Sequence, residues 1–224
     1  PNTLELFDDA KFTKFERYNI REKYYIPQDK TVFIYGGNIS KPQGVDFLIT
    51  CLESQAGNNN TFFIIIGSGS EYAKISDYLK KSKQKNLILI GQLPREEYYQ
   101  ILKCCDVGLV FLDYRFTIPN IPSRILPYMQ YRKPILCVTD TNTDIGEVVE
   151  SGGFGWWCPS NDVSKFAQAI DQICKTELSK LEDKSFEYFV NHYTVDISYK
   201  AIMDNFWKKE WMNEKNMYNW GYQY

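Results

Sequence analysis

The sequence predicts an α/β fold with a doubly wound sheet of six parallel strands, flanked by helices and followed by extra C-terminal helices. Two observations carry this prediction. From Thr31 onward, short β-branched and apolar runs alternate with longer segments of helical period, which is the pattern of consecutive βαβ units. Three successive apolar runs end in glycine, as expected where strands turn into helices. A chain of 224 residues has room for one such core and its appendages.

The predicted strands and helices alternate along the chain in the Rossmann-like manner. The six strands are expected over residues 31–36, 61–67, 86–91, 106–112, 134–139 and 154–158. The helices between and after them are expected over residues 45–56, 71–82, 95–104, 123–131, 143–150 and 162–174. Two further helices are expected over residues 179–193 and 195–211.

The chain divides into three parts. Residues 1–30 are mixed in charge and weakly periodic, so we expect a connecting arm there. Residues 31–206 hold the alternating elements and are expected to form the folded domain. Residues 207–224 read as an aromatic, polar tail.

Composition excludes several classes of function. A formal charge of -2 gives no global reason to bind nucleic acid, so no nucleic-acid partner is expected. No apolar run approaches the roughly 20 residues that span a bilayer, and the N-terminus has no signal pattern, which favours a cytoplasmic location. The six cysteines form no C-x-x-C pair and His192 is the single histidine, so we expect reduced core thiols and no metal site.

Ligands of open parallel sheets bind beyond the carboxyl ends of the strands. The first three strands end there in glycine-containing loops, where bare backbone can approach a ligand and offer N–H groups to an anion. These loops are Gly36-Gly37-Asn38 continuing to Lys41 and Gln43, then Gly67-Ser68-Gly69, and then Gly91-Gln92-Leu93-Pro94. Glycine is also an ordinary turn residue, so a purely structural role remains the alternative for each loop.

The fourth loop ends in Pro122-Ser123-Arg124, and a helix is predicted to begin there. Pro122 and Ser123 suit the first turn and the cap of a helix. Arg124 in the first turn is opposed by the helix dipole unless an anion lies at that helix end. A diphosphate held by free N–H groups and by the guanidinium would remove this conflict. The alternative is an arginine paired with a surface carboxylate.

Other nucleotide-binding classes fit the residues poorly. A G-x-G-x-x-G fingerprint would need a third glycine at Tyr72, which disfavours a nicotinamide cofactor. The chain has no G-x-x-x-x-G-K-[ST] loop and no G-x-S-x-G elbow, so a P-loop enzyme and a hydrolase are unsupported. A receiver domain would need an acidic residue at the end of the first strand, where Gly36 and Gly37 stand. We therefore expect no cofactor.

Six segments in order resemble the C-terminal domain of GT-B glycosyltransferases of the retaining group-1 type (family 4), over roughly residues 30–206. They are YGGNISKPQGVDFLI, FFIIIGSGSEYAKI, NLILIGQLPREEYYQIL, CCDVGLVFLDY, IPSRILPYMQYRKPIL and ESGGFGWWCPSND. Six cues in this order are far more specific than any one of them.

The resemblance implies transfer of a sugar, with retention of anomeric configuration, from a nucleotide-sugar to a glycan or lipid-linked acceptor, as in surface polysaccharide biosynthesis. A UDP-sugar is the expected donor. The acceptor would be held by an N-terminal domain absent from this chain, of which residues 1–30 would be the linker, so the isolated chain is expected to be inactive. The resemblance also leaves room for peripheral association of the full-length enzyme with the inner face of the membrane. The resemblance also suggests that aromatic residues of the tail cover surface left by the absent N-terminal domain; they are Trp207, Trp211, Trp220 and Tyr224.

The resemblance also implies roles for particular residues. The group beside the diphosphate would comprise Gly37, Asn38, Lys41 and Gln43, with Gly67 and Gly69 in the next loop. Gln92 and Leu93 would contact the nucleobase. The N–H groups of Ser123, Arg124 and Ile125 would bind the phosphates. The Arg124 side chain would act catalytically, by stabilising the negative charge that develops on the leaving diphosphate without a metal.

The sequence departs from the family pattern at its carboxylates. Pro127 stands where members commonly carry the glutamate that holds the ribose, and Pro119 stands at the first glutamate of their E-x7-E pattern. Asn38 and Gln43 replace the usual basic pair. These departures keep a second hypothesis open, a degenerate GT-B domain that serves as a non-catalytic binding or scaffolding module.

Overall fold

The computed structural model describes residues 3–6, 13–116 and 121–218, with side chains as far as residue 206. Its strands form one parallel sheet in the order β3-β2-β1-β4-β5-β6. They are β1 (Thr31–Asn38), β2 (Thr61–Ser68), β3 (Leu87–Ile90), β4 (Val107–Phe111), β5 (Ile135–Thr139) and β6 (Gly155–Pro159). The order reverses between β1 and β4, which confirms the predicted doubly wound sheet.

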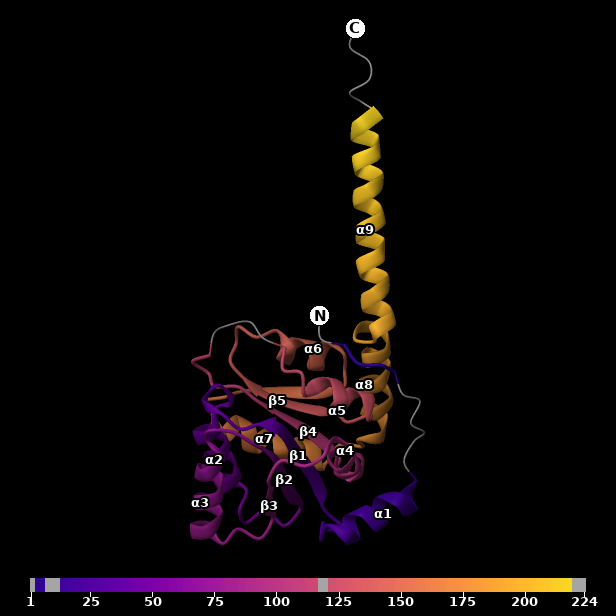
Figure 1. Cartoon of the computed structure of the whole chain (residues 1–224). Helices are drawn as coiled ribbons and strands as arrows, with labels where there is room; N and C mark the ends of the chain where they lie inside the picture. Colours follow the sequence, from indigo (N-terminus) through magenta and orange to yellow (C-terminus); the bar gives the residue numbers. More distant parts are fainter. Residues whose placement is uncertain (1–2, 7–12, 117–120, 219–224) are drawn as a thin grey trace.

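Helices cover both faces of the sheet, as Figure 1 shows. Side chains alternate along β1, so Phe33 and Tyr35 enter one core while Val32 and Ile34 enter the other. The first core is closed by α2 (Val45–Ser54), α3 (Tyr72–Ser82) and α7 (Val163–Cys174). The second is closed by α4 (Arg95–Cys104), α5 (Ile125–Gln130), α6 (Ile145–Ser151) and α8 (Ser179–His192). Burial on both faces explains why the strands read as unbroken apolar runs.

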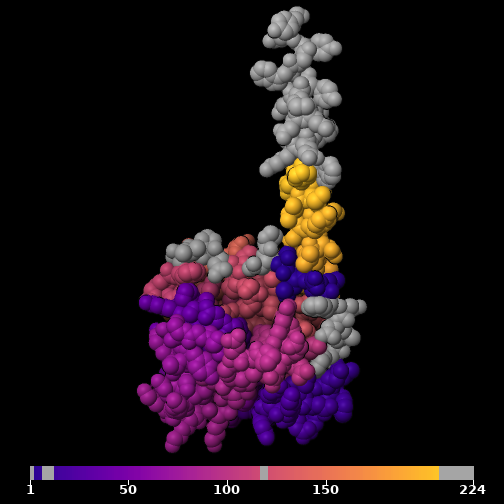
Figure 2. Space-filling model, in the orientation of Figure 1, coloured from indigo at the N-terminus to yellow at the C-terminus, as the bar shows by residue number. Residues whose placement is uncertain are grey.

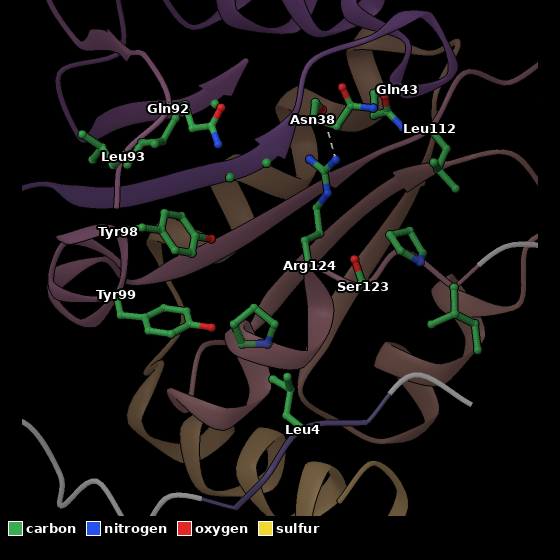
Figure 3. A pocket seen from close by; sticks show the side chains of 17 residues that line it. Leu4, Asn38, Gln43, Gln92, Leu93, Tyr98, Tyr99, Leu112, Ser123 and Arg124 are labelled. Atoms are coloured by element: carbon green, nitrogen blue, oxygen red, sulfur yellow. Dashed lines mark hydrogen bonds between the residues drawn. The ribbon is translucent and has the colours of Figure 1, made fainter. Parts of the chain in front are cut away.

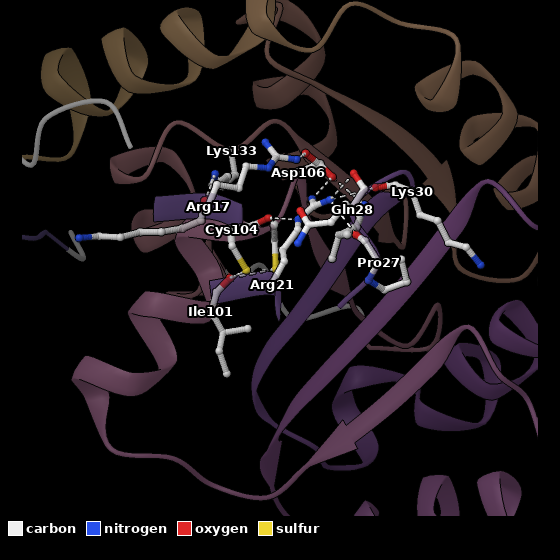
Figure 4. A network of polar contacts seen from close by, with 12 residues as sticks. Arg17, Arg21, Pro27, Gln28, Lys30, Ile101, Cys104, Asp106 and Lys133 are labelled. Atoms are coloured by element: carbon white, nitrogen blue, oxygen red, sulfur yellow. Dashed lines mark hydrogen bonds and ion pairs between the residues drawn. The ribbon is translucent and has the colours of Figure 1, made fainter. Parts of the chain in front are cut away.

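The predicted arm contains a helix that the sequence analysis did not expect, α1 (Lys14–Lys23). Thr13 and Glu16 form a reciprocal capping box at its start. Arg21 is buried, donates through Nε to the carbonyl of Cys104 at 2.9 Å and pairs with Asp106 at 2.7 Å (Figure 4). Arg17 also pairs with Asp106. The helix is therefore held by long-range polar contacts more than by an apolar face.

The C-terminal helix α9 (Val195–Tyr218) projects away from the domain (Figure 1). The N-terminal segment lies at its base (Figure 2), where the N–H of Leu4 donates to the carbonyl of Tyr193 at 3.1 Å and the N–H of Val195 donates to the carbonyl of Leu4 at 3.2 Å. No helix in the described part of the chain is long and apolar enough to cross a bilayer. The expectations for Pro119 and for the side chains of Trp207, Trp211, Trp220 and Tyr224 lie outside the described residues.

All six cysteines are free thiols, and five of them are buried while Cys174 is half-buried. The only histidine, His192, lies exposed at the end of α8 and stacks on Tyr188 with ring centroids 4.2 Å apart. It therefore has a surface packing role.

Candidate functional site

A cavity of about 580 Å³ opens at the carboxyl ends of β1 and β2 (Figure 3). Its walls come from the start of α4, from the segment that leads into α5, and from Leu4 of the N-terminal segment. Eight of the residues predicted for the site line it: Gly37, Asn38, Gln43, Gly67, Gln92, Leu93, Ser123 and Arg124. Residues predicted from separate loops thus meet at one point.

The floor of the cavity is bare backbone at Gly36, Gly37 and Gly67. Gly37 and Gly67 are paired across β1 and β2, and both have positive φ, 113° and 153°. A Cβ on Gly67 would lie 1.8 Å from the carbonyl oxygen of Gly37, and one on Gly36 would lie 2.3 Å from the hydroxyl of Tyr98. No other residue fits at 36 or 67 without moving its neighbours.

Arg124 is the cation of the site. Its Nη2 donates to the carbonyl of Asn38 at 3.2 Å, and its guanidinium lies over the Tyr35 ring, 4.2 Å from the centroid. Tyr35 donates to the same carbonyl at 2.6 Å. Burial raises the pKa of the Tyr35 hydroxyl, and the charge of Arg124 opposes part of this rise. The guanidinium is thus fixed over the end of β1.

One buried nitrogen of Arg124 has no partner among the described residues. Nη1 is buried and makes no hydrogen bond to any described residue. No ion pair to Arg124 occurs in the described ranges, so the alternative of an arginine matched to a surface carboxylate has no support there. A buried donor on a charged group is costly to leave unpaired, which makes this position suited to an anion.

Tyr128 anchors the short helix that carries Arg124. Its hydroxyl accepts from the N–H of Gly36 at 3.0 Å and lies 3.3 Å from the carbonyl oxygens of Ile34 and Leu109. A Cβ on Gly108 would lie 2.4 Å from the Tyr128 ring, so this glycine makes the space. Burial raises the pKa of Tyr128 to about 12. Arg124 is the cap residue of this helix, so the anchor at Tyr128 fixes the helix start from which the Arg124 side chain extends.

The start of α5 differs from the prediction. The helix begins at Ile125, with Arg124 in the cap position and no side-chain cap from Ser123. The N–H of Ile125 donates to the carbonyl of Pro122 at 3.1 Å, which closes a turn before the helix. Of the three N–H groups predicted to bind phosphate, the one of Ile125 is therefore already engaged, and its side chain lies in the core.

Lys41, Gly69 and Ile125 do not line the cavity. Lys41 is exposed at the start of the 3-10 turn η1 (Lys41–Gln43). Gly69 packs against backbone, because a Cβ there would lie 2.2 Å from the carbonyl oxygen of Ile39. Gln43 from the same turn does reach the cavity, and its Oε1 accepts from the Ser40 hydroxyl at 2.5 Å.

Pro127 lines the cavity as the third residue of α5. The N–H groups of the first helical turn have no intrahelical acceptor, so a proline at this position removes no helical hydrogen bond. The site therefore tolerates Pro127 structurally and gains an apolar wall from it.

Leu4, Tyr98 and Tyr99 also line the cavity, although no sequence motif predicted them there. The two tyrosines lie in the first half of α4 and extend toward Arg124 in Figure 3. The sequence signal that could have placed them was the glycine at the end of β1, because the missing side chain at Gly36 leaves room for the Tyr98 ring. Leu4 carries no signal, because its place depends on the backbone bridge to Thr194.

Comparisons with known proteins agree with this architecture. The family model described as glycosyl transferases group 1 matches residues 16–188. The probable glycosyltransferase WbjE of Pseudomonas aeruginosa is 32% identical over 152 residues, which is 68% of this chain and 38% of that protein. An uncharacterized glycosyltransferase of Methanocaldococcus jannaschii is 20% identical over 207 residues, 90% of this chain and 49% of that protein. The chain spans less than half of either relative.

Solved structures show the same fold. Anabaena HepE in complex with UDP and glucose superposes with a TM-score of 0.73 at 15% identity, over 92% of this chain and 55% of HepE. WaaG, a glycosyltransferase involved in lipopolysaccharide biosynthesis, gives a TM-score of 0.67 at 13% identity, over 89% of this chain and 54% of WaaG. The family match and these likenesses together lead to one conclusion: the chain belongs to the group 1 glycosyltransferases and has the fold of their C-terminal GT-B domain.

Proposed function

We propose that this chain binds a nucleotide-sugar, a UDP-sugar, through its diphosphate. The sugar would then pass, with retention of configuration, to a glycan or lipid-linked acceptor held by an N-terminal domain, as in surface polysaccharide biosynthesis. A lipid-linked acceptor would place the enzyme in the cytoplasm at the inner face of the membrane. The observation that carries the proposal is Arg124, whose buried Nη1 has no partner among the described residues.

The cavity suits a diphosphate at Arg124. A phosphate oxygen at Nη1 would satisfy the unpaired donor and bring the opposite charge to a cation that has no carboxylate in the described ranges. The glycine floor beside it lets the phosphates approach the backbone. A volume of about 580 Å³ lies within the range of small-ligand sites. HepE, which has the same fold, was solved with UDP-glucose, and this supports a uridine nucleotide as the first ligand to test.

In transfer, Arg124 would act on the leaving group. Negative charge grows on the diphosphate as the bond to the sugar breaks, and a fixed guanidinium stabilises this charge without reorganising. Tyr35 and the Asn38 carbonyl hold the guanidinium before the ligand arrives. The role needs no general base on this chain.

Calorimetry with UDP, GDP and UDP-glucose tests the proposal. Arg124→Ala should weaken nucleotide binding at least about tenfold, as expected for loss of a charged hydrogen bond. Arg132→Ala is the matched control, because it removes an equal charge from an arginine that already pairs with Asp183 at 2.7 Å. Equal affinity of the wild type and Arg124→Ala would contradict the proposal. Failure of the full-length protein to bind any nucleotide would favour the non-catalytic module instead.

A further inference from the structure

We infer that Tyr99 binds the nucleoside of the donor: its hydroxyl donates a hydrogen bond to a nucleoside oxygen, and Arg95 holds that hydroxyl in place. The inference rests on the proposed function, because it assumes that the diphosphate lies at Arg124. It adds a residue and an interaction that neither the sequence motifs nor the family likeness assign.

The aromatic side chains of the cavity lie on one side of Arg124 only. On the other side, Gln43 and Ser123 present amide and hydroxyl groups beside Leu112, and the polar groups suit the hydroxyls of a sugar. On the aromatic side, Tyr98 and Tyr99 present their rings, with Leu93 and the amide of Gln92 next to them. A nucleoside combines a flat ring with a few oxygens, so it suits the aromatic side, where it can pack on rings and meet few polar groups. Figure 3 shows both tyrosines on this side.

The Tyr99 ring is held on several sides. Its centroid lies 5.6 Å from that of Tyr98 and 5.1 Å from that of Tyr131. The guanidinium of Arg95, one turn earlier on α4, lies 5.3 Å from the ring centroid. A ring fixed in this way loses little further freedom when a ligand binds, which favours a role in recognition.

The Tyr99 hydroxyl is oriented as well. Nε of Arg95 donates to the hydroxyl oxygen at 2.9 Å, so the phenol is the acceptor in this bond and keeps its own hydrogen to donate. Donation from a cation also polarises the O–H group and strengthens it as a donor. Tyr99 lines the cavity, and its hydroxyl makes no donated bond to another described residue. A ligand oxygen that enters the cavity can accept this hydrogen in place of solvent.

Tyr24 provides a matched comparison. The Tyr24 hydroxyl donates to Glu97 at 2.8 Å, and Glu97 lies on α4, the helix that carries Tyr99. Tyr24 does not line the cavity. Removing this hydroxyl therefore tests the loss of a tyrosine hydrogen bond to α4 without any change in the cavity.

The experiment compares UDP with inorganic pyrophosphate, which occupies only the phosphate position, by calorimetry. Tyr99→Phe keeps the ring and should weaken UDP binding about fivefold, in line with loss of one neutral hydrogen bond, while pyrophosphate binding stays unchanged. Arg95→Met should weaken UDP binding by a smaller factor and also spare pyrophosphate. Tyr24→Phe should leave both affinities unchanged.

The outcomes separate the two proposals. If UDP and pyrophosphate bind and both depend on Arg124, but Tyr99→Phe leaves UDP binding unchanged, the role of Tyr99 is refuted and the proposed function stands. If Tyr99→Phe weakens the binding of UDP and of pyrophosphate equally, the role of Tyr99 is also refuted, because its hydroxyl would then affect phosphate binding or the fold. If the wild-type chain binds neither ligand, both proposals fail together.

Discussion

Asp106 should hold the N-terminal helix on the domain, and Asp106→Asn tests this. Asp106 is 8% exposed, and its carboxylate accepts from Arg21 at 2.7 Å, from the N–H of Val32 at 2.7 Å and from Arg17 (Figure 4). An asparagine keeps one acceptor oxygen but removes the charge opposite the buried Arg21. Removing one partner of a buried ion pair costs about 3 to 5 kcal/mol, and the remaining oxygen puts the expected loss near the lower end, at about 3 kcal/mol. For a chain of this size that corresponds to a fall in Tm of roughly 6 to 12 °C.

Urea unfolding followed by circular dichroism measures this loss. Asp77→Asn is the control, because the same substitution there breaks an exposed pair with Lys80 and should cost less than about 0.5 kcal/mol. A double-mutant cycle with Arg21→Met should show strong coupling, since the methionine no longer needs a counter-charge. A loss below about 1 kcal/mol for Asp106→Asn would refute the assignment of Asp106 as the anchor of α1.

Two further predictions concern the floor and the anchor of the cavity. Gly67→Ala should destabilise the fold by about 3 kcal/mol, because its Cβ would lie 1.8 Å from a backbone oxygen and its φ is 153°. Gly91 has open space around it, so Gly91→Ala is the control and should change the free energy of unfolding by less than about 0.5 kcal/mol. Similar urea midpoints for the two variants would contradict this prediction. Burial raises the pKa of Tyr128 to about 12, above the usual value near 10, so the folded state favours the neutral phenol. The stability that it contributes should be intact below pH 10 and fall as the pH rises from 10 to about 12, and Tyr128→Phe should make the measured fall shallower; an unchanged slope would count against this role.

The sheet could be predicted from sequence because its signals are local. Burial on both faces forces unbroken apolar runs, and each run ends where a glycine or a polar residue begins the turn. Helix α1 could not be predicted with the same ease. Its capping box is visible at Thr13 and Glu16, but its attachment depends on Arg21 meeting Asp106, 85 residues further along the chain. No periodicity reports such a contact.

Part of the site could also be predicted, because the residues that mark it follow directly after the strands in the sequence. Glycine loops and Arg124 could be placed at one edge because parallel strands bring their carboxyl ends together. Leu4 and the two tyrosines of α4 could be assigned to the cavity only from the structure. From sequence alone, a tyrosine on an amphipathic helix is interpreted as a core residue, and only the structure shows that Tyr98 faces the bare backbone of Gly36. The start of α5 was misjudged because a turn closed by the Pro122 carbonyl takes the place of a capped helix end.

The bare floor of the cavity has a consequence for how such a site can diverge. A side chain added at Gly67 meets the carbonyl oxygen of Gly37 at 1.8 Å, so substitution there damages the fold before it can alter ligand choice. The walls come instead from side chains of α4, from α5 and from a terminal segment, where a change of side chain alters the lining of the cavity directly. Variation in ligand preference among related chains should therefore accumulate in the walls, while the floor stays the same.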